Sequence, residues 1–211
     1  MKYLAGIARG EEVEVPDDKI IDIPAKTVRE GDAQAYWDRL KELQAIGKEA
    51  EDAPKPADSD LRFAFVINNP DPFWSYARAG CYKAEQEFGI IADFEAPHDG
   101  SPTAQNRILE NILQRGGYRG VAVSPNDPDN QTAILNEVAA AMPLLCHDSD
   151  APESDRLFYL GTNNYEAGRL LGKLVKETLP DGGKLMIFVG KIDVLNASER
   201  RRGLLEELAA E

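Results

Sequence analysis

From residue 62 onward, short apolar runs alternate with segments whose apolar residues recur at helical spacing. Residues 62–67 (RFAFVI) form a continuous apolar run that ends in Asn-Asn-Pro, a pattern typical of a strand buried in a parallel sheet. Residues 75–88 follow with helical spacing, and Gly89 is placed to end that helix. The alternation continues, predicting further strands at 90–96, 120–125, 143–148, 157–162 and 184–190 and helices at 103–116, 130–142, 165–179 and 198–211.

This order of strands and helices predicts an α/β protein: a Rossmann-like parallel sheet with right-handed crossovers and helices on both faces. Sheets of this type bind their ligands beyond the carboxyl ends of the strands. We therefore expect the functional residues in the loops that follow the predicted strands, which are 68–74, 97–102, 124–129, 147–152, 161–164 and 190–197.

The first 60 residues do not continue this alternation. Residues 2–13 have the pattern of a helix end, and residues 32–47 that of a whole helix. Between them, residues 20–28 have the apolar pattern of a strand that Pro24 interrupts, which favours an edge or crossing position. Residues 48–60 are charged and contain prolines, as in a flexible linker.

The chain is strongly acidic, with 37 Asp and Glu against 24 Lys and Arg and a net charge of -13. Nucleic acids and anionic membranes require clustered basic residues, so we expect neither as a partner. No apolar run reaches the roughly 18 residues of a membrane span, and the chain opens without a signal-peptide pattern. We therefore expect no membrane insertion, and a chain that stays in the cytoplasm as expressed.

Catalytic and metal-binding patterns are lacking in the sequence. It contains no nucleophile elbow, phosphate-binding loop, dinucleotide fingerprint or zinc-protease motif, so we expect neither an enzyme nor a cofactor. With His98 and His147 as the two histidines, we expect no metal site. Cys81 falls in a helical pattern and Cys146 in an apolar run, so both are expected to be buried small apolar side chains and not a disulfide.

The loops at the carboxyl ends combine neutral amides, carboxylates and an arginine with the aromatic pair Phe73 and Trp74. Sugar hydroxyls both donate and accept hydrogen bonds, so Asp and Asn side chains satisfy them well. The C–H faces of a sugar ring lie on aromatic rings, and Arg supplies forked donors. This mixture favours a sugar as the ligand. The polar residues concerned are Asn68, Asn69, Asn126, Asp127, Asp148, Ser149, Asp150, Asn163, Asn164, Asn196 and Arg202.

The same residues have plainer alternatives, which the sequence leaves open. Phe73 and Trp74 could form a hydrophobic staple onto the following helix. The run Arg200–Arg202 could be a solvated helix face. Loops of α/β proteins also collect turn formers and helix caps, an alternative that applies to Asn163, Asn164, Asp127 and Asp129.

Five segments occur in a characteristic order: RFAFVINNPDPFWSYARAGCYKAEQEFGI, APHDGSPTAQNRILENILQRGGYRGVAVSPNDPD, PLLCHDSDAP, LGTNNYEAGRLLGKLV and NASERRRGLLEEL. Together they resemble type I periplasmic sugar-binding proteins of the ribose-binding kind, and the resemblance covers residues 61–211 without a break. It implies two Rossmann-like lobes joined by a three-stranded hinge. Such lobes close on a monosaccharide and deliver it to the permease of an ABC transporter.

The resemblance implies ligand-binding roles in the loop after the first strand. Asn69 matches the polar residue that follows this strand, and Asn68 is the alternative in a register shifted by one. Phe73 and Trp74 match the aromatic pair that holds the sugar ring.

Roles are also implied at the hinge and in the second lobe. Asp148 matches the carboxylate of the first hinge crossing, and Ser149 follows it where the family often has Arg. Arg202, just before Gly203, matches the arginine of the second lobe, with Asn196 nearby as a further candidate.

The N-terminal segment resembles the carboxyl end of the same family. KYLAGIARGEEVEVPDDKIIDIPAKTV and the following AYWDRLKEL resemble its last first-lobe helix, final hinge crossing and terminal helix. This order implies a circularly permuted and truncated chain that lacks about 100 residues of the second lobe. On this hypothesis the helix in residues 1–13 packs on the sheet. The implied domains are 1–19, a permuted helix of the first lobe; 20–47, the hinge strand and terminal helix of the second lobe; 48–60, a linker; 61–145, the first lobe; and 146–211, a partial second lobe.

The expected function is therefore binding of a monosaccharide between two lobes, as the solute-binding component of an ABC sugar transporter, periplasmic or extracellular in the parent family. The incomplete second lobe implies weak binding and exposed apolar surface, and with it self-association or a complementing fragment. The alternative is an engineered fragment or permuted half with no ligand of its own, used for folding, complementation or assembly. A lac-repressor-like regulator of the same fold is disfavoured by the negative charge.

Overall fold

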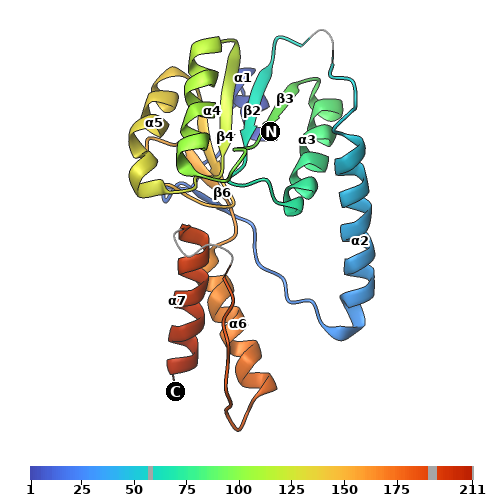
Figure 1. Cartoon of the computed structure of the whole chain (residues 1–211), viewed down its shortest axis with the longest axis vertical. Helices are drawn as coiled ribbons and strands as arrows, with labels where there is room; N and C mark the ends of the chain where they lie inside the picture. The colour runs from blue at the N-terminus through green and yellow to red at the C-terminus, as the bar shows by residue number, and fades with distance from the viewer. Residues whose placement is uncertain (57–58, 190–193, 211) are drawn as a thin grey trace.

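The computed structural model describes residues 1–56, 59–189 and 194–210. In these ranges six strands form one parallel sheet in the order β1-β6-β5-β4-β2-β3 (Figure 1), which confirms the predicted α/β fold. The strands are β1 (Ile20–Asp22), β2 (Arg62–Val66), β3 (Ile91–Glu95), β4 (Tyr118–Val123), β5 (Leu144–His147) and β6 (Phe158–Gly161). The helices are α1 (Lys2–Ala8), α2 (Glu30–Glu49), α3 (Ser75–Phe88), α4 (Pro102–Arg115), α5 (Pro128–Ala141), α6 (Asn164–Thr178) and α7 (Leu195–Ala209).

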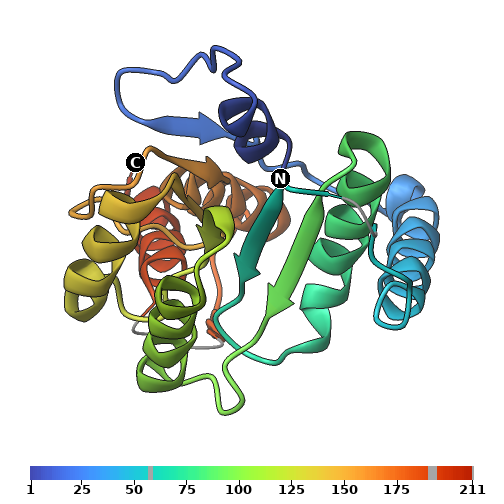
Figure 2. The same ribbon diagram turned by 90° about the horizontal axis from the view of Figure 1, so that it is seen from above.

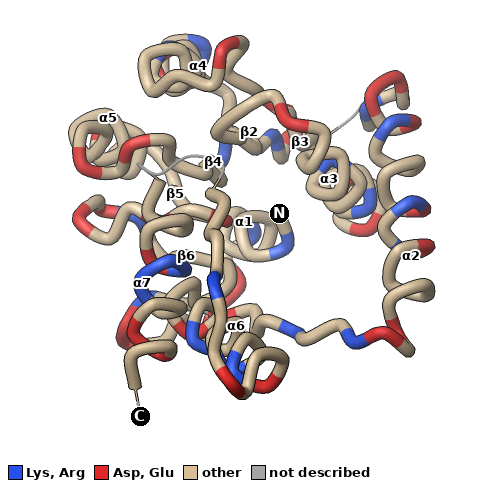
Figure 3. Tube along the Cα trace, turned by 60° about the horizontal axis from the view of Figure 1, so that its bottom comes forward, with Lys and Arg blue, Asp and Glu red and all other residues tan. Residues whose placement is uncertain are grey.

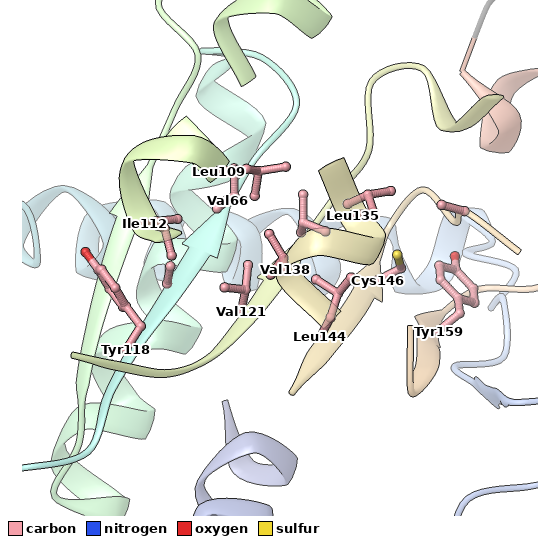
Figure 4. Close-up of a cluster of buried hydrophobic side chains, with 13 residues drawn as sticks. Val66, Leu109, Ile112, Tyr118, Val121, Leu135, Val138, Leu144, Cys146 and Tyr159 are labelled. Carbon is pink, nitrogen blue, oxygen red and sulfur yellow. The ribbon is translucent and has the colours of Figure 1, made fainter. Parts of the chain in front are cut away.

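One face of the sheet is buried under α4 and α5. Leu109 of α4 and Leu135 of α5 pack with Val121 and Val123 of β4 in a continuous apolar cluster (Figure 4). Side chains alternate between the two faces of a strand, so the intervening Ala122 belongs to the cluster on the other face. The continuous apolar runs in the sequence reflect this burial from both sides.

The other face is covered by α1 and α3 (Figure 2). Leu4 of α1 is fully buried with Phe63 of β2 and Phe158 of β6. A Cβ on Gly120 would lie 2.9 Å from Cδ2 of Leu4, so this glycine allows α1 to approach β4 closely. Burial of a leucine side chain stabilises the fold by about 2 kcal/mol. The prediction that the N-terminal helix packs on the sheet is confirmed.

The sheet extends past residue 145, the predicted end of the first lobe, because it includes β6. At its edge β1 pairs with β6 in parallel, with Ile21 opposite Leu160, and the strand ends before Pro24. The segment after β1 leads to α2, which was predicted to be the terminal helix of the second lobe. In the structure α2 packs beside α3, outside the sheet (Figure 1).

Below the sheet, α6 and α7 form a tightly packed pair (Figure 1). A Cβ on Gly168 would lie 2.2 Å from the carbonyl oxygen of Arg200, and one on Gly203 would lie 2.1 Å from that of Tyr165. Glycine at both positions therefore lets the two helix backbones touch. This crossing fixes which side of α7 faces α6.

The predicted strand at 184–190 does not form in its described part, residues 184–189. A strand needs neighbours that satisfy its backbone hydrogen bonds, and this segment pairs with no strand of the described chain. Most of its side chains are exposed, Met186 by 75% and Phe188 by 85%. Parts of four predicted segments lie outside the described residues: 57–58 of the linker, 190 of this strand, 190–193 of the following loop, and 211 of the last helix. Among the described helices, none has the length and apolar character needed to cross a bilayer.

Candidate functional site

A cavity of about 900 Å³ opens beyond the carboxyl ends of β2, β4 and β5, at the end of the sheet where the strand order predicts a ligand. The loops after β2 and β3 line it together with the start of α7. Predicted site residues contribute much of the wall: Asn68, Asn69, Phe73, Trp74, Asp148 and Asn196. The other lining residues are Pro70, Asp71, Asp99, Gly100, Ser101, Pro102, Asn126, Val194, Ala197 and Arg200.

Asp148 lies directly after β5, with its backbone in the left-handed region at φ 58°. Its Oδ2 accepts a hydrogen bond from the Ser124 hydroxyl at 3.1 Å and another from Nδ2 of Asn196 at 3.2 Å. Burial raises the pKa of this carboxyl, while the hydrogen bond from Ser124 and the charge of Arg200 oppose that rise. Within the described part of the chain, Oδ1 makes no hydrogen bond, which leaves an acceptor for a ligand.

Asn68 and Asn126 join the loops after β2 and β4. Nδ2 of Asn68 donates to the Ser124 hydroxyl at 3.1 Å, and this hydroxyl donates to Asp148 in turn. Nδ2 of Asn126 donates to the backbone carbonyl of Asn68 at 2.7 Å. Hydrogen bonds therefore run in series from Asn68 to Asp148 across three neighbouring strands.

Two buried glutamines fix these loops from below. Nε2 of Gln105 donates to the carbonyls of Ile67 at 2.9 Å and Ser124 at 2.8 Å, and its Oε1 accepts from the Asn126 amide at 3.1 Å. Oε1 of Gln131 accepts from the amides of Asn126 and Asp127, both at 2.9 Å. Sequence reasoning missed both residues, although a lone Gln at an inward helical position was a usable signal.

The aromatic pair divides into one exposed and one buried ring. Phe73 is 54% exposed at the cavity, whereas Trp74 is only 5% exposed. The indole N–H of Trp74 donates to Oδ1 of Asn69 at 3.2 Å, and its ring meets that of His147 edge to face, with centroids 5.6 Å apart. Trp74 therefore supports Asn69 and the loop, while Phe73 offers the open aromatic face.

Asn196 and Arg200 project into the cavity from the first two turns of α7. Nδ2 of Asn196 donates to Oδ2 of Asp148 at 3.2 Å and lies 3.4 Å from the backbone carbonyl oxygen of the same residue, just after β5. Nε of Arg200 donates to Oδ1 of Asn164 at 2.8 Å, which anchors the guanidinium at the cavity wall. The cavity therefore has a cation facing the carboxyl of Asp148.

Arg202, the arginine predicted for the site, lies outside the cavity. Its guanidinium sits over the ring of Tyr165, 4.6 Å from the centroid, and its side chain is exposed. Two positions along a helix rotate a side chain by about 200°, so Arg202 faces away from the side that carries Arg200. The predicted helix reaches the cavity, but the arginine that lines the cavity is Arg200 and not Arg202.

Ser149 does not line the cavity either. It is fully buried, and its hydroxyl makes no hydrogen bond among the described residues. Its amide donates to the carbonyl of His147 at 2.6 Å, which closes a tight turn after β5. That turn, together with the left-handed backbone of Asp148, directs the Asp148 carboxyl and the Ser149 hydroxyl to different places.

Several polar loop residues are helix caps. Asn163 accepts the Glu166 amide at the start of α6, and Asp127 accepts the Asn130 amide at the start of α5. Asn164 is buried and bonds Arg200, so it positions a cavity residue without lining the cavity. The cap alternative is thus confirmed for Asn163 and Asp127.

Cysteines and histidines contribute no metal site in the described residues. Cys81 and Cys146 are free and buried, as expected, and burial raises the pKa of Cys81 to about 12. His147 stacks on Phe65 with centroids 4.1 Å apart, and burial lowers its pKa to about 3. The imidazole is therefore a neutral packing group near neutral pH.

Comparison with known families places this cavity in context. The family described as "Periplasmic binding protein domain" matches residues 63–211. A solute-binding protein of an ABC transporter from Burkholderia graminis C4D1M, solved in complex with D-arabinose, is 27% identical with a TM-score of 0.69. The alignment covers 72% of this chain and 52% of that protein.

Two further structures are similar. A sugar-binding protein of a sugar ABC transporter from Bacillus halodurans is 27% identical with a TM-score of 0.64, over 72% of this chain and 52% of that one. GanP, a glucose-galactose binding protein from Geobacillus stearothermophilus, is 23% identical with a TM-score of 0.67. The alignment covers 72% of this chain and 55% of GanP, and at this identity it supports the fold alone. The chain thus spans about half the length of the solved proteins it matches.

Proposed function

Because the chain belongs to the periplasmic binding protein domain family, we propose that it binds a monosaccharide in the cavity beyond β2, β4 and β5. One observation carries the proposal: the unoccupied acceptor of Asp148 and the open face of Phe73 line the same cavity. A carboxylate grips sugar hydroxyls, and an aromatic face receives the C–H side of the ring. The D-arabinose complex of the Burkholderia graminis protein supports a monosaccharide as the ligand.

Each cavity residue has a separate role in the proposed binding. Asp148 accepts hydrogen bonds from hydroxyls, and Arg200 donates to a hydroxyl or ring oxygen. Asn69 and Asn196 supply amides that both donate and accept. Asn68 holds Ser124 and thereby Asp148. The family consists of solute-binding proteins and not of enzymes, so the expected outcome is reversible binding without chemistry.

Delivery to the permease of an ABC sugar transporter is part of the proposal. The Burkholderia graminis and Bacillus halodurans proteins, both 27% identical, are described as components of ABC transporters. A solute-binding protein of this kind meets its sugar outside the cytoplasmic membrane, so we place the parent protein in the periplasm or outside the cell.

We expect weak binding, since the chain spans about half the length of the proteins it matches. Enclosure from two sides excludes water and strengthens each hydrogen bond, and less enclosure lowers affinity. A dissociation constant of about 1 mM, worth roughly 4 kcal/mol, is a reasonable expectation.

A second candidate function is that of a fragment which binds sugar only after assembly with a second copy or a complementing segment. The exposed apolar side chains of residues 184–189 favour it, because such surface is costly in water. Sedimentation velocity decides: a concentration-dependent dimer supports assembly, and a monomer at all concentrations contradicts it.

We also propose that the segment order is a circular permutation, in which residues 1–47 correspond to the carboxyl end of the family and residues 61–211 to the part that precedes it. The packing of Leu4 under Phe63 and the pairing of β1 with β6 support it, because both link residues 1–22 to the matched region. A chain that starts at residue 61 and carries residues 1–56 after residue 211 on a flexible linker should keep its melting temperature. Loss of cooperative melting in that chain would count against the proposal.

A panel of ligands tests the proposed function. Calorimetric titration with D-arabinose, D-ribose, D-glucose and D-galactose should give saturable heat for at least one sugar below about 10 mM. L-Leucine serves as a control of similar size. The proposal fails if no sugar gives saturable heat or if leucine binds equally well.

A further inference from the structure

We propose that α2 is a brace that holds the aromatic loop, residues 68–74, in the form that presents Phe73 to the cavity. The inference rests on the proposed function for its effect on sugar binding. It concerns an element outside residues 63–211, the region that the family matches. The contact between α2 and the loop is local, and its effect on the loop can be measured with and without sugar.

The brace meets the loop through Gly47, the buried residue of α2. A Cβ on Gly47 would lie 2.0 Å from the carbonyl oxygen of Ser75 and 2.8 Å from its carbonyl carbon. These are backbone atoms, which cannot rotate away as the end of a side chain would. The backbones of α2 and α3 therefore touch at the first residue of α3, and only glycine permits that contact.

Ser75 is continuous with the aromatic loop. Pro72–Trp74 form a single 3₁₀ turn that runs directly into α3, and the Ser75 hydroxyl donates to the carbonyl of Pro72 at 2.8 Å. Asp71 closes the turn by accepting the Phe73 amide at 2.8 Å. A displacement of Ser75 is therefore passed to Phe73 and Trp74 through a short, hydrogen-bonded segment.

Side chains near the end of α2 extend the contact. A groove of about 570 Å³ between α2 and the aromatic loop is lined by Gln44, Lys48 and Glu51 on one side and by Pro70 and Trp74 on the other. Glu51, just past the end of α2, pairs with Arg78 of α3 at 3.5 Å. Arg78 in turn lies over the ring of Phe94, 4.2 Å from its centroid. The brace thus joins α2, α3 and β3 around the back of the loop.

The first half of α2, residues 30–39, is exposed along its whole length and offers little other support to the loop. Acidic and basic residues are interspersed along the helix (Figure 3), and Trp37 is 54% exposed. A solvated helix contributes little packing energy, so its held end near Gly47 carries the interaction. Substitution at this one residue should therefore act on the loop without changing the remaining helix.

Gly31 of the same helix provides a matched control, because a Cβ there meets nothing within 4 Å. Leucine in place of glycine raises helix propensity at both positions. The experiment compares Gly47→Leu and Gly47→Ala with Gly31→Leu and Gly31→Ala. It measures sugar affinity by calorimetry, and amide hydrogen exchange of Phe73 and Trp74 without sugar.

We expect Gly47→Leu to weaken sugar binding at least 10-fold and to speed exchange of these amides at least 10-fold. Gly47→Ala should show smaller changes in the same direction, and both Gly31 variants should match the wild type. The inference is overturned if folded Gly47→Ala and Gly47→Leu keep wild-type exchange at Phe73 and Trp74. It is also overturned if amides throughout α3 and β4 speed up equally, because that reports global destabilisation.

The two proposals fail in distinguishable ways. If the wild-type chain binds no monosaccharide, the proposed function fails while the exchange measurement still tests the brace. If Gly47→Leu does not fold, Gly47→Ala and Glu51→Gln provide the same readouts with smaller perturbations. Faster amide exchange at Phe73 and Trp74 in these variants supports the proposal that α2 braces the loop. Wild-type exchange rates at both residues in both variants contradict it.

Discussion

Asn196 at the start of α7 donates a hydrogen bond to Oδ2 of Asp148, 48 positions earlier in the chain, at 3.2 Å. This bond joins the α6–α7 pair to the end of β5. It also helps to fix the Asp148 carboxyl group, and Asp148 lines the cavity. The geometry of the proposed sugar site therefore depends on two segments that meet only in the folded chain.

Asp148→Asn should weaken sugar binding by 10- to 100-fold, because hydrogen bonds to a charged acceptor are worth about 1.5–3 kcal/mol each. The variant should be at least as stable as the wild type near neutral pH, since it removes a buried charge. Calorimetry and urea unfolding measure the two effects. Unchanged affinity would remove Asp148 from the site.

The raised pKa of Asp148 gives these effects a pH dependence. The folded chain holds the proton more tightly than the unfolded chain does, so this group's contribution to stability is lost as pH rises from 3.8 through the raised value. Binding follows the opposite direction, because the sugar needs the carboxylate and should dissociate as pH falls through the raised pKa. Asp148→Asn should lose this pH dependence of affinity, which titrations at several pH values can check.

Arg200→Ala and Arg202→Ala form a matched pair on α7. Arg200 lines the cavity, so its loss should weaken binding about 10-fold by removing charged donors. Arg202 lies over Tyr165 outside the cavity, so its loss should leave affinity unchanged. Equal effects of the two substitutions on affinity would show that the assignment of Arg200 is wrong.

Phe73→Ala and Trp74→Ala should separate binding from folding. Loss of the exposed Phe73 ring should cost about 1 kcal/mol of sugar-stacking energy, roughly fivefold in affinity, with little change in stability. Loss of the buried Trp74 ring should lower the free energy of unfolding by about 3–5 kcal/mol. Urea unfolding and calorimetry on each variant check both expectations, and a reversed order would contradict them.

Gln105→Met should destabilise the chain by about 3 kcal/mol, because two carbonyls, of Ile67 and Ser124, lose a buried donor. Gln114→Met on the exposed side of the same helix is the control and should be near neutral. Thermal unfolding measures the difference. Equal melting temperatures would mean that Gln105 does not hold the cavity loops.

His147 should make the chain sensitive to mild acid. Its folded pKa of about 3 lies below the ordinary 6.5, so stability is complete above 6.5 and is lost as pH falls towards 3. The expected loss between pH 7.5 and 5 is about 2 kcal/mol from this residue. His147→Phe should remove that part of the loss, and an unchanged pH profile in the variant would refute the assignment.

The sequence pattern predicted most of the fold because buried parallel strands and amphipathic helices leave strong local signals. The exceptions have physical reasons. Residues 184–189 are apolar enough for a strand but have no neighbouring strand in the described chain. The place of α2 beside α3 includes a backbone contact between Gly47 and Ser75, which no periodicity encodes.

The candidate site was predictable to the level of loops, and less so to the level of single residues. Asp148, Asn69 and Phe73 follow strand ends, where any α/β sheet gathers its ligand residues, and all three line the cavity. Arg200 and Arg202 lie on different sides of α7, and the sequence pattern did not show which side faces the cavity. Gln105 acts from inside a helix, away from the loops where ligands were sought. The ligand roles themselves stay predictions until binding is measured.

Calorimetric titration with D-arabinose of the purified chain, of Asp148→Asn and of Arg202→Ala tests whether the cavity beside Asp148 binds a monosaccharide. We expect saturable heat for the wild type and for Arg202→Ala, and a loss of at least 10-fold in affinity for Asp148→Asn. Saturable binding that Asp148→Asn leaves unchanged would contradict the claim that this cavity holds the sugar.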